Sequence, residues 1–375
     1  MNMVKLGEIA KIQYGYAFKS DNFITNAIPV IRIGDITEDG LIPDYNCCYP
    51  EVYWNEHPEC RLKKDAILIA MSGATVGKSC KNLSDNKYLL NQRVAAVNVN
   101  TQNVTNYIFY SIKSSAFKKY VEKASIGCAQ PNISGQQISN FMIPLRTKEE
   151  QEIIALRLEK IEQIIKSHKF LIQKYDTLIK SRFIEMFGTP EYNEKGFPLE
   201  KIQDVIEFQG GSQPEKKYFE YKKTESNIRL IQIRDYKTDR FITYIPKDKA
   251  KRFCTKDDIM IGRYGPPIFQ ILQGIEGCYN VALMKAIPKK GNKEFIRNFL
   301  KQDCLLHYLE SFSTRTAGQD GIQMDKLLNY PFPYPPIALQ NDFASFVQQI
   351  DKSKFEIWLY LNLCYIIEKR VFTYD

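Results

Sequence analysis

The fold of this chain is decided by residues 147–188, which read TKEEQEIIALRLEKIEQIIKSHKFLIQKYDTLIKSRFIEMFG. Thr147 and Glu150 are spaced as a capping box, in which each side chain accepts a hydrogen bond from the other residue's backbone N–H. Gly188 is typical of a helix end. About 40 residues at 1.5 Å each predict a rod of roughly 60 Å. Apolar residues recur with a period of about seven, which indicates a coiled-coil seam.

A second long helix is expected over residues 337–375, after the run YPPIALQ at 334–340, where Pro336 suits a first helical turn. Two similar long helices in one chain should pack together as an antiparallel coiled coil. His168 falls on the seam of the first helix, where we expect an interface residue rather than a metal ligand. The residues expected to pair the helices are Ile154, Leu158, Ile161, Ile165, Ile172, Ile179, Val347, Ile350, Ile357 and Leu361.

The chain also repeats itself when it is shifted by roughly 190 residues. The matching blocks are KLGEIAKIQYG (5–15) with KIQDVIEFQGG (201–211), VIRIGDI (30–36) with LIQIRDY (230–236), DAILIAMSG (65–73) with DDIMIGRYG (257–265), LLNQRVAAV (89–97) with CYNVALMKA (278–286), and residues 130–151 with 319–340. Each copy contains short β-branched runs between turns, followed by helical stretches. The sequence therefore predicts an α+β chain with a pseudo-two-fold internal repeat. Mixed α/β globules are expected at 1–146 and 191–336, and long helices at 147–190 and 337–375.

The composition favours a polyanionic partner and argues against several kinds of site. The net charge is +9, which suggests nucleic acid first and a membrane surface second. Nine cysteines without a C-x-x-C pair fit a reduced cytosolic protein. Three scattered histidines make a histidine-based zinc site or hydrolase improbable. Because the chain has neither a signal-like start nor a run of about 18 apolar residues, we expect a cytoplasmic protein with no membrane contact.

Sequence motifs for catalysis are incomplete. The stretch MSGATVGKS (71–79) resembles a nucleotide-binding P-loop, but Gly73 and Gly77 enclose only three residues where the motif needs four. Its counterpart in the repeat, RYGPPIFQI (263–271), lacks Gly-Lys-Ser altogether. The run YPPI (334–337) lacks the polar residue that an adenine methyltransferase places before its prolines, and PEVYWNEH (50–57) lacks the lysine of a nuclease metal cluster. We expect no catalytic residue and no metal site in this chain.

The layout resembles the specificity (S) subunit of Type I restriction-modification systems. The resemblance rests on LGEIAKIQYGYAF (6–18), DAILIAMSGATVGK (65–78), the junction from QPNIS (130–134) through FMIPL (141–145) to EEQ (149–151), and the helix end LIKSRFIEMFG (178–188). It covers nearly the whole chain. The second copy departs from the pattern, with QDGI in place of QPNI, IALQ in place of EEQ, and no terminal Phe-Gly.

The resemblance implies a non-catalytic subunit that reads a bipartite target on double-stranded DNA. Each globule would be a target recognition domain, and the helices would hold the two globules apart. Methyltransferase (M) subunits carrying S-adenosylmethionine would dock on the helices, and restriction (R) subunits using ATP and Mg would complete the nuclease. No cofactor is expected in this chain. The alternative is a coiled-coil protein-interaction adaptor whose basic globules do not read DNA.

Candidate DNA-binding residues are the polar and basic residues of turns in corresponding blocks, since Arg reads guanine and Asn or Gln reads adenine. In the first globule they are Tyr14, Lys19, Arg32, Ser72, Lys78, Gln92, Arg93 and Gln130. In the second they are Gln209, Ser212, Arg234, Arg263, Tyr264, Arg315 and Gln319. Ion pairs of Arg32 and Arg234, with Asp35 and Asp235 nearby, remain open. So do side-chain-to-backbone bonds of Gln130 and Gln319.

Overall fold

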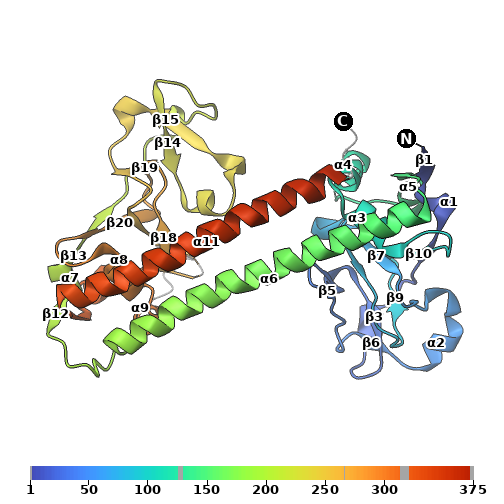
Figure 1. The fold of residues 1–375 in the computed structure, drawn as a ribbon, viewed down its shortest axis with the longest axis horizontal. Helices are drawn as coiled ribbons and strands as arrows, with labels where there is room; N and C mark the ends of the chain where they lie inside the picture. The colour runs from blue at the N-terminus through green and yellow to red at the C-terminus, as the bar shows by residue number, and fades with distance from the viewer. Residues whose placement is uncertain (1, 126–129, 266, 313–320, 372–375) are drawn as a thin grey trace. The chain divides into compact units, whose positions relative to one another are not determined.

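The computed structural model of this protein describes residues 2–125, 130–265, 267–312 and 321–371 (Figure 1). The chain divides into two compact units. Unit 1 contains Met1–Lys169 and the end of the chain from Trp358, and unit 2 contains Phe170–Ile357. The long helices α6 (Lys148–Phe187) and α11 (Ile337–Val371) each contribute one part to each unit.

Unit 1 is built on an antiparallel sheet with the strand order β2-β10-β7-β8. Its strands are β2 (Ala10–Tyr14), β10 (Val94–Val99), β7 (Ile67–Ala70) and β8 (Ser79–Lys81). A smaller sheet joins β6 (Cys48–Tyr49), β3 (Ile28–Ile31) and β9 (Leu89–Leu90), and β3 runs parallel to β9. The two-stranded β1 (Met3–Lys5) and β11 (Met142–Pro144) bring the two ends of this globule together. Helices α3 (Thr105–Lys113), α4 (Ser115–Ala124) and α5 (Gly135–Ser139) complete the core.

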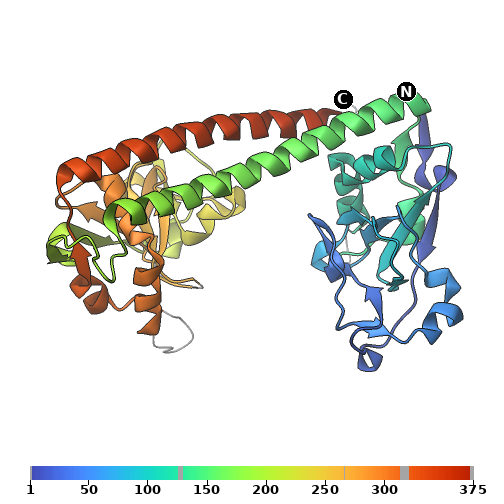
Figure 2. The same ribbon diagram turned by 60° about the horizontal axis from the view of Figure 1, so that its bottom comes forward.

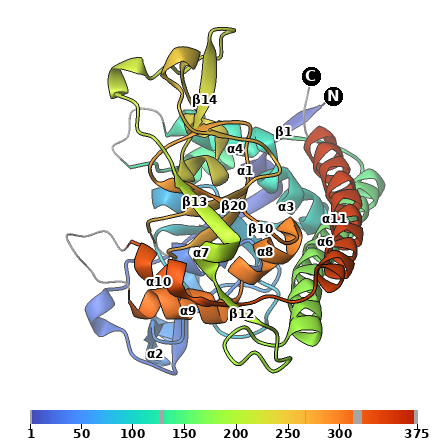
Figure 3. The same cartoon turned by 90° about the vertical axis from the view of Figure 1, so that its left-hand side faces the viewer.

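Unit 2 repeats the main sheet strand by strand, and its smaller sheet has one strand more than that of unit 1. Its main sheet has the order β13-β20-β17-β18, formed by β13 (Ile206–Gly210), β20 (Leu283–Pro288), β17 (Ile259–Gly262) and β18 (Gln270–Gln273). The smaller sheet contains β15 (Thr243–Pro246), β14 (Asn227–Ile231), β19 (Gly277–Tyr279) and β16 (Phe253–Cys254), and β14 runs parallel to β19. Strands β12 (Leu199–Lys201) and β21 (Pro331–Pro333) pair as β1 and β11 do. Helix α8 (Lys293–Leu300) packs between this main sheet and the long helices, with α9 (Asp303–Ser311) and α10 (Met324–Asn329) beside it (Figure 3).

Single backbone hydrogen bonds confirm that the two globules are copies. The Leu6 N–H donates to the Phe141 carbonyl at 2.8 Å, and the Ile202 N–H donates to the Tyr330 carbonyl at 3.1 Å. The Leu145 N–H donates to the Asn2 carbonyl, and its match in unit 2 is the Tyr334 N–H, which donates to the Pro198 carbonyl. In the same way, the bond from the Asn91 N–H to the Ile31 carbonyl is matched by the bond from the Asn280 N–H to the Ile231 carbonyl. The predicted internal repeat and the α+β class are therefore correct.

Two glycines shared by the repeats mark a close approach between backbones. A Cβ atom on Gly15 would lie 2.0 Å from the Leu90 carbonyl oxygen, and one on Gly211 would lie 1.9 Å from the Asn280 carbonyl oxygen. No side chain fits at such distances. Gly15 lets the end of β2 lie directly against the turn before β10. Gly211 does the same for the end of β13 and the turn before β20.

The start and end of α6 follow the predicted sequence signals. The Thr147 N–H donates to a Glu150 carboxylate oxygen at 3.0 Å, and the Glu150 N–H donates to the Thr147 hydroxyl at 3.3 Å. Gly188 adopts the left-handed conformation, with φ of 74°, directly after the last helical residue. The capping box and the glycine stop are both confirmed.

A buried glutamine fixes each long helix to its own globule. The Gln151 carboxamide oxygen accepts the Val104 N–H at 2.9 Å, ahead of α3, and its NH₂ group donates to the Arg146 carbonyl. In unit 2, Gln340 accepts the Asn292 N–H at 2.8 Å and donates to the Pro335 carbonyl. The matched glutamines thus set where each helix starts relative to the globule before it.

Within each unit the segments of α6 and α11 lie side by side and run antiparallel (Figures 1 and 2). In unit 1, the His168 ring lies 6.2 Å from that of Tyr360, and the Nδ1 atom of His168 is buried with no hydrogen-bond partner among the described residues. In unit 2, the Lys354 ammonium donates to Asp176 at 2.6 Å, and the rings of Phe183 and Phe343 meet at 5.5 Å. The ten seam residues named above are all buried or half-buried.

Both long helices also carry apolar side chains that stay exposed. In unit 1 these include Ile153, Leu156 and Ile164 of α6 and Leu359, Tyr360, Leu363, Ile366 and Ile367 of α11. A helix with apolar residues outside its packed seam indicates a second binding face. Among the residues that the structure describes, no helix has the length and apolar character that crossing a membrane requires.

Candidate nucleic-acid interface

Three turns of unit 1 enclose a cavity of about 510 Å³ at one end of the main sheet. The first turn follows β7, the second connects β9 to β10, and the third precedes α5. Four residues predicted from the sequence line the cavity together: Ser72, Gln92, Arg93 and Gln130. The remaining lining residues are Met71, Asn132, Ser134, Gly135, Pro131 and Ile133.

Backbone hydrogen bonds between the turns hold this cavity in place. The Met71 N–H donates to the Arg93 carbonyl at 2.9 Å, and the Ile133 N–H donates back to Met71 at 2.9 Å. The Gly73 N–H donates to the Pro131 carbonyl at 3.0 Å. Ser134 and Gln137 form a capping box at the start of α5. The turns are therefore rigid although their side chains face solvent.

The polar side chains around the cavity have few partners of their own. Those of Gln92, Arg93 and Gln130 are exposed and make no hydrogen bond or ion pair with the described residues. The Ser72 hydroxyl is buried and has no hydrogen-bond partner in the part of the chain that the structure describes. A guanidinium, two carboxamides and a hydroxyl thus surround one space with free donors and acceptors, which suits a hydrogen-bonding planar ligand such as a base edge.

Two exposed tyrosines lie beside the cavity. Tyr14, which was predicted, is 49% exposed, and its ring covers Gly135, where a Cβ atom would lie 1.9 Å from the ring. Tyr16 is 46% exposed and stacks on His57 with a centroid separation of 4.2 Å. The Gln92 N–H donates to the Tyr16 carbonyl at 2.9 Å, which places Tyr16 next to the cavity. Tyr16 was not among the predicted residues, although the alternation Tyr-Gly-Tyr at 14–16 could have indicated it.

Three other predicted residues of unit 1 lie apart from the cavity lining. The Arg32 guanidinium pairs with Asp44 at 2.9 Å, while Asp35 accepts only the Arg32 backbone N–H, at 2.7 Å. Burial raises the pKa of Asp35, against the effect of that hydrogen bond. The side chains of Lys19 and Lys78 are exposed on turns. The ion pair left open for Arg32 therefore exists, with Asp44 as its partner.

The corresponding turns of unit 2 meet in the same way but carry different residues. Tyr264 bridges to Gly321 as Ser72 bridges to Asn132 in unit 1. The Arg263 guanidinium lies over the Tyr264 ring, 5.4 Å from its centroid. The Ser212 N–H donates to the Tyr279 carbonyl at 3.1 Å. Arg315 and Gln319 lie outside the described residues.

The other two predictions in unit 2 have structural partners. The Gln209 carboxamide oxygen accepts the Tyr279 hydroxyl at 3.1 Å. Its counterpart Gln13 donates to two backbone carbonyls, which indicates a structural role for both glutamines. The Arg234 guanidinium donates to the Thr243 hydroxyl at 3.2 Å rather than pairing with Asp235, and lies over Phe241.

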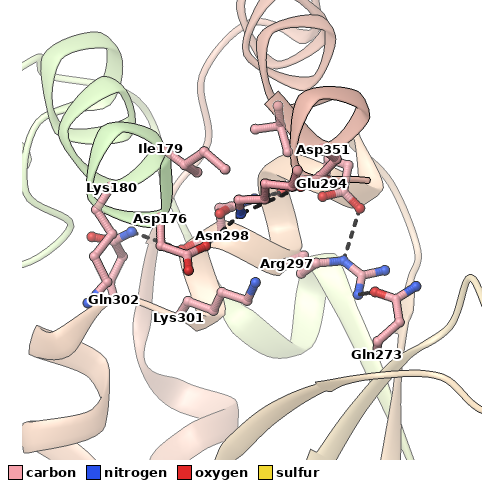
Figure 4. A pocket seen from close by; sticks show the side chains of 12 residues that line it. Asp176, Ile179, Lys180, Gln273, Glu294, Arg297, Asn298, Lys301, Gln302 and Asp351 are labelled. Atoms are coloured by element: carbon pink, nitrogen blue, oxygen red, sulfur yellow. Dashed lines mark hydrogen bonds and ion pairs between the residues drawn. The ribbon is translucent and has the colours of Figure 1, made fainter. Parts of the chain in front are cut away.

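A second cavity, of about 480 Å³, lies in unit 2 between α8, the end of β18 and the long helices (Figure 4). Most of its charges are paired within it. Arg297 pairs with Glu294 at 2.9 Å, and Lys354 pairs with Asp176. Lys301 points into the space and has no ion pair among the described residues; burial lowers its pKa. The Lys354–Asp176 pair ties α11 to α6, and the Arg297 guanidinium also donates to the Asp257 carbonyl at 3.0 Å. The cavity is therefore best explained as part of the packing of unit 2.

The described residues offer little for catalysis. No three His, Cys, Asp or Glu side chains among them are grouped so as to hold a metal ion. Burial raises the pKa of the Cys60 thiol to about 11 and that of Cys80 to about 12, so both stay protonated at neutral pH. The cavity of unit 1 contains neither a carboxylate nor a histidine.

Comparisons with known proteins agree with this picture. A family model described as "Type I restriction modification DNA specificity domain" matches residues 1–176 and 194–358. The chain is similar to the MjaVIII specificity subunit of Methanocaldococcus jannaschii, with 31% identity over 168 residues, or 44% of this chain and 40% of that protein. It is also similar to the EcoBI specificity subunit of Escherichia coli, with 25% identity over 47% of this chain and 35% of that protein. These matches span less than half of the curated relatives.

Solved structures share the fold over the full length. An S subunit of a Type I restriction-modification system from M. genitalium superposes with a TM-score of 0.55 at 14% identity, covering 100% of this chain and 96% of that one. A chain from a study of complex assembly in the Type I system superposes with a TM-score of 0.56 at 14% identity, covering 99% and 96%. At such identities the likeness shows the fold alone.

Proposed function

Because this chain belongs to the family of Type I restriction-modification DNA specificity domains, we propose that it reads a bipartite target on double-stranded DNA, one half with each globule. In each unit, turns from separate parts of the chain lie together at one end of the main sheet. The presence of this arrangement in both units is the observation that supports the proposal. In unit 1 those turns present Gln92, Arg93 and Gln130, and in unit 2 they present Arg263 and Tyr264. Arg suits guanine and Gln suits adenine in the major groove.

The long helices would hold the readers at a fixed separation and dock the catalytic subunits. Helix α6 runs through 40 residues without interruption, and a continuous helix keeps its length where a flexible linker does not. Its exposed Ile153 and Leu156, together with Leu363 and Ile366 of α11, offer apolar surface to methyltransferase subunits. Those subunits would bring S-adenosylmethionine, and restriction subunits would bring ATP and Mg. The present chain would then supply specificity without catalysis.

The test of base reading is to compare Arg93→Ala with Lys78→Ala in the full chain, assembled with its methyltransferase subunits. Methylation mapping in cells identifies the target first. Binding of matched and mismatched duplexes is then measured. We expect Arg93→Ala to lose discrimination at one base pair of one half-site, worth about 1–3 kcal/mol.

Lys78→Ala is the matched control, because Lys78 is an exposed cation on a turn outside the cavity lining. It should weaken binding to all duplexes equally and reduce the salt slope by about 1. A protein-interaction adaptor would instead show no base preference before either substitution, and that result would refute the proposed function.

A further inference from the structure

The repeats differ most in the charge of one corresponding segment. We call the first lobe residues 15–66, between β2 and β7, and the second lobe residues 211–258, between β13 and β17. Each lobe contains all strands of the smaller sheet of its unit except one, which is β9 in unit 1 and β19 in unit 2. The first lobe has five Lys and Arg against nine Asp and Glu, a net charge of −4. The second has thirteen Lys and Arg against eight Asp and Glu, a net charge of +5.

The charges of both lobes are at the surface. Twelve of the thirteen basic side chains of the second lobe are exposed, and seven of the nine acidic side chains of the first lobe are exposed. In the second lobe, ion pairs within the described residues involve Arg229, Lys217 and Lys249. The remaining exposed cations, Lys222, Lys223, Lys247 and Lys251 among them, have no ion pair there. The surplus is therefore available to an anionic partner.

Aromatic side chains are interleaved with these cations. Tyr221 is 74% exposed. The Phe241 ring lies between two guanidinium groups, 5.7 Å from that of Arg234 and 5.4 Å from that of Arg240. Basic surfaces with exposed aromatic rings are typical of nucleic-acid binding, since the cations contact phosphates while rings pack on sugars or bases.

Both lobes adjoin the turn that carries the candidate reading residues of their own unit. In unit 2, a Cβ atom on Gly262, directly before Arg263, would lie 2.8 Å from the Cδ1 atom of Ile233, two residues after the second lobe's β14. In unit 1, a Cβ atom on Gly73 would lie 3.7 Å from the Ile33 Cδ1 atom. Figure 1 shows β14 and β15 of the second lobe together. The two lobes thus occupy equivalent places with opposite charge.

We propose that the two recognition domains hold DNA by unequal means. The second lobe is a phosphate-binding surface, and the first lobe makes no phosphate contacts. This inference rests on the proposed function. The first globule then takes its phosphate contacts from residues outside its lobe, Lys78 among them, whereas the second takes them from its lobe as well. Phosphate contacts made by lysine release counterions, so each contributes about −0.9 to the slope of log affinity against log salt.

The test uses the full chain assembled with its methyltransferase subunits and a duplex carrying the mapped target. The lobe variant replaces Lys222, Lys223, Lys247 and Lys251 with Gln. If all four contact phosphates, the salt slope becomes shallower by about 3.6. Affinity for the target and for a scrambled duplex should fall together, by tenfold or more at low salt.

The matched control replaces four exposed lysines of unit 1 with Gln and so changes the net charge equally: Lys11, Lys63, Lys118 and Lys119. We expect its salt slope to change by less than about 1. A shift as large as that of the lobe variant would overturn the proposal, because total charge and not the second lobe would then set the affinity.

A third variant examines the first lobe directly. Glu38→Gln, Asp39→Asn and Glu56→Gln remove three exposed acids that form no ion pair with the described residues. The expected salt slope equals that of the unchanged protein; a steeper slope would mean that the first lobe lies against phosphates, contrary to the proposal. If the lobe variant still binds the target specifically and its salt slope equals that of the unchanged protein, this inference is refuted and the proposed function stands. Absence of sequence-specific binding in the unchanged protein would refute both.

Discussion

Replacing Gly15 with Ala should destabilise unit 1 by about 3 kcal/mol. The new Cβ atom would lie 2.0 Å from the Leu90 carbonyl oxygen, so the two backbones must separate by at least about 1 Å. Hydrogen bonds from Tyr16 to Leu90 and from Gln92 to Tyr16, both 2.9 Å long, span this contact. Overpacking costs about 1–3 kcal/mol and each weakened bond about 1 kcal/mol. Alanine also reduces the conformational entropy of the unfolded chain, which offsets up to about 1 kcal/mol of this destabilisation.

Hydrogen exchange of peptides covering 12–18 and 89–94 measures this effect locally, which avoids assuming one transition for a chain of two units. Gly34→Ala is the control, because no atom lies within 4 Å of its Cβ position and its φ is not positive. It should keep native protection. Gly211→Ala should repeat the loss around the Asn280 turn of unit 2. Native protection in Gly15→Ala would show that the close approach is not a constraint, and the explanation of the shared glycine would be wrong.

Three further outcomes are expected. Leu158→Asp with Ile165→Asp puts two charges on the buried seam and should cost about 3 kcal/mol or more, seen as loss of assembly with methyltransferase subunits in size-exclusion chromatography. Burial pushes the pKa of Glu162 up, but the hydrogen bonds from Lys113 and Tyr110 and the charges of Lys113 and Lys166 together outweigh it and keep that pKa below its ordinary value of 4.5. This carboxylate therefore contributes stability above about pH 5 that is lost as the pH falls through and below 4.5, and Glu162→Gln should remove that part of the acid-unfolding slope. Exchange of 1–146 for another recognition domain should change one half of the mapped methylation target and leave the other half intact.

Helix limits and the duplication were predictable because their causes are local or periodic. The capping box of Thr147 and Glu150 needs only a three-residue spacing, and the stop at Gly188 needs only the residue type that adopts a positive φ most readily. The repeat was visible because matched residues such as Gln151 and Gln340 accept equivalent backbone hydrogen bonds, and this shared contact restricts which residue type can occupy each position.

Partners brought together by loops were not predictable. Asp35 is near Arg32 in sequence, yet the guanidinium pairs with Asp44, which follows a short hairpin of β4 (Ile36–Thr37) and β5 (Gly40–Leu41). The carboxamide of Gln209 suggested a base contact but is held by the Tyr279 hydroxyl, from a strand 70 positions later. Neither contact follows a helix or strand period, so no pattern in the sequence indicates it.

The divergence between the repeats follows from which residues the fold constrains. Gly15 and Gly211 cannot change without moving backbone, so the framework keeps them. The exposed pair Gln92 and Arg93 has Val281 and Ala282 as its counterpart, although the turns that carry them are matched. Exposed substitutions away from special backbone positions usually change stability by about 0.5 kcal/mol or less. Turn residues and lobe charges can therefore vary while the scaffold stays constant. A duplicated gene for this scaffold can for that reason acquire two different half-sites without a change of fold.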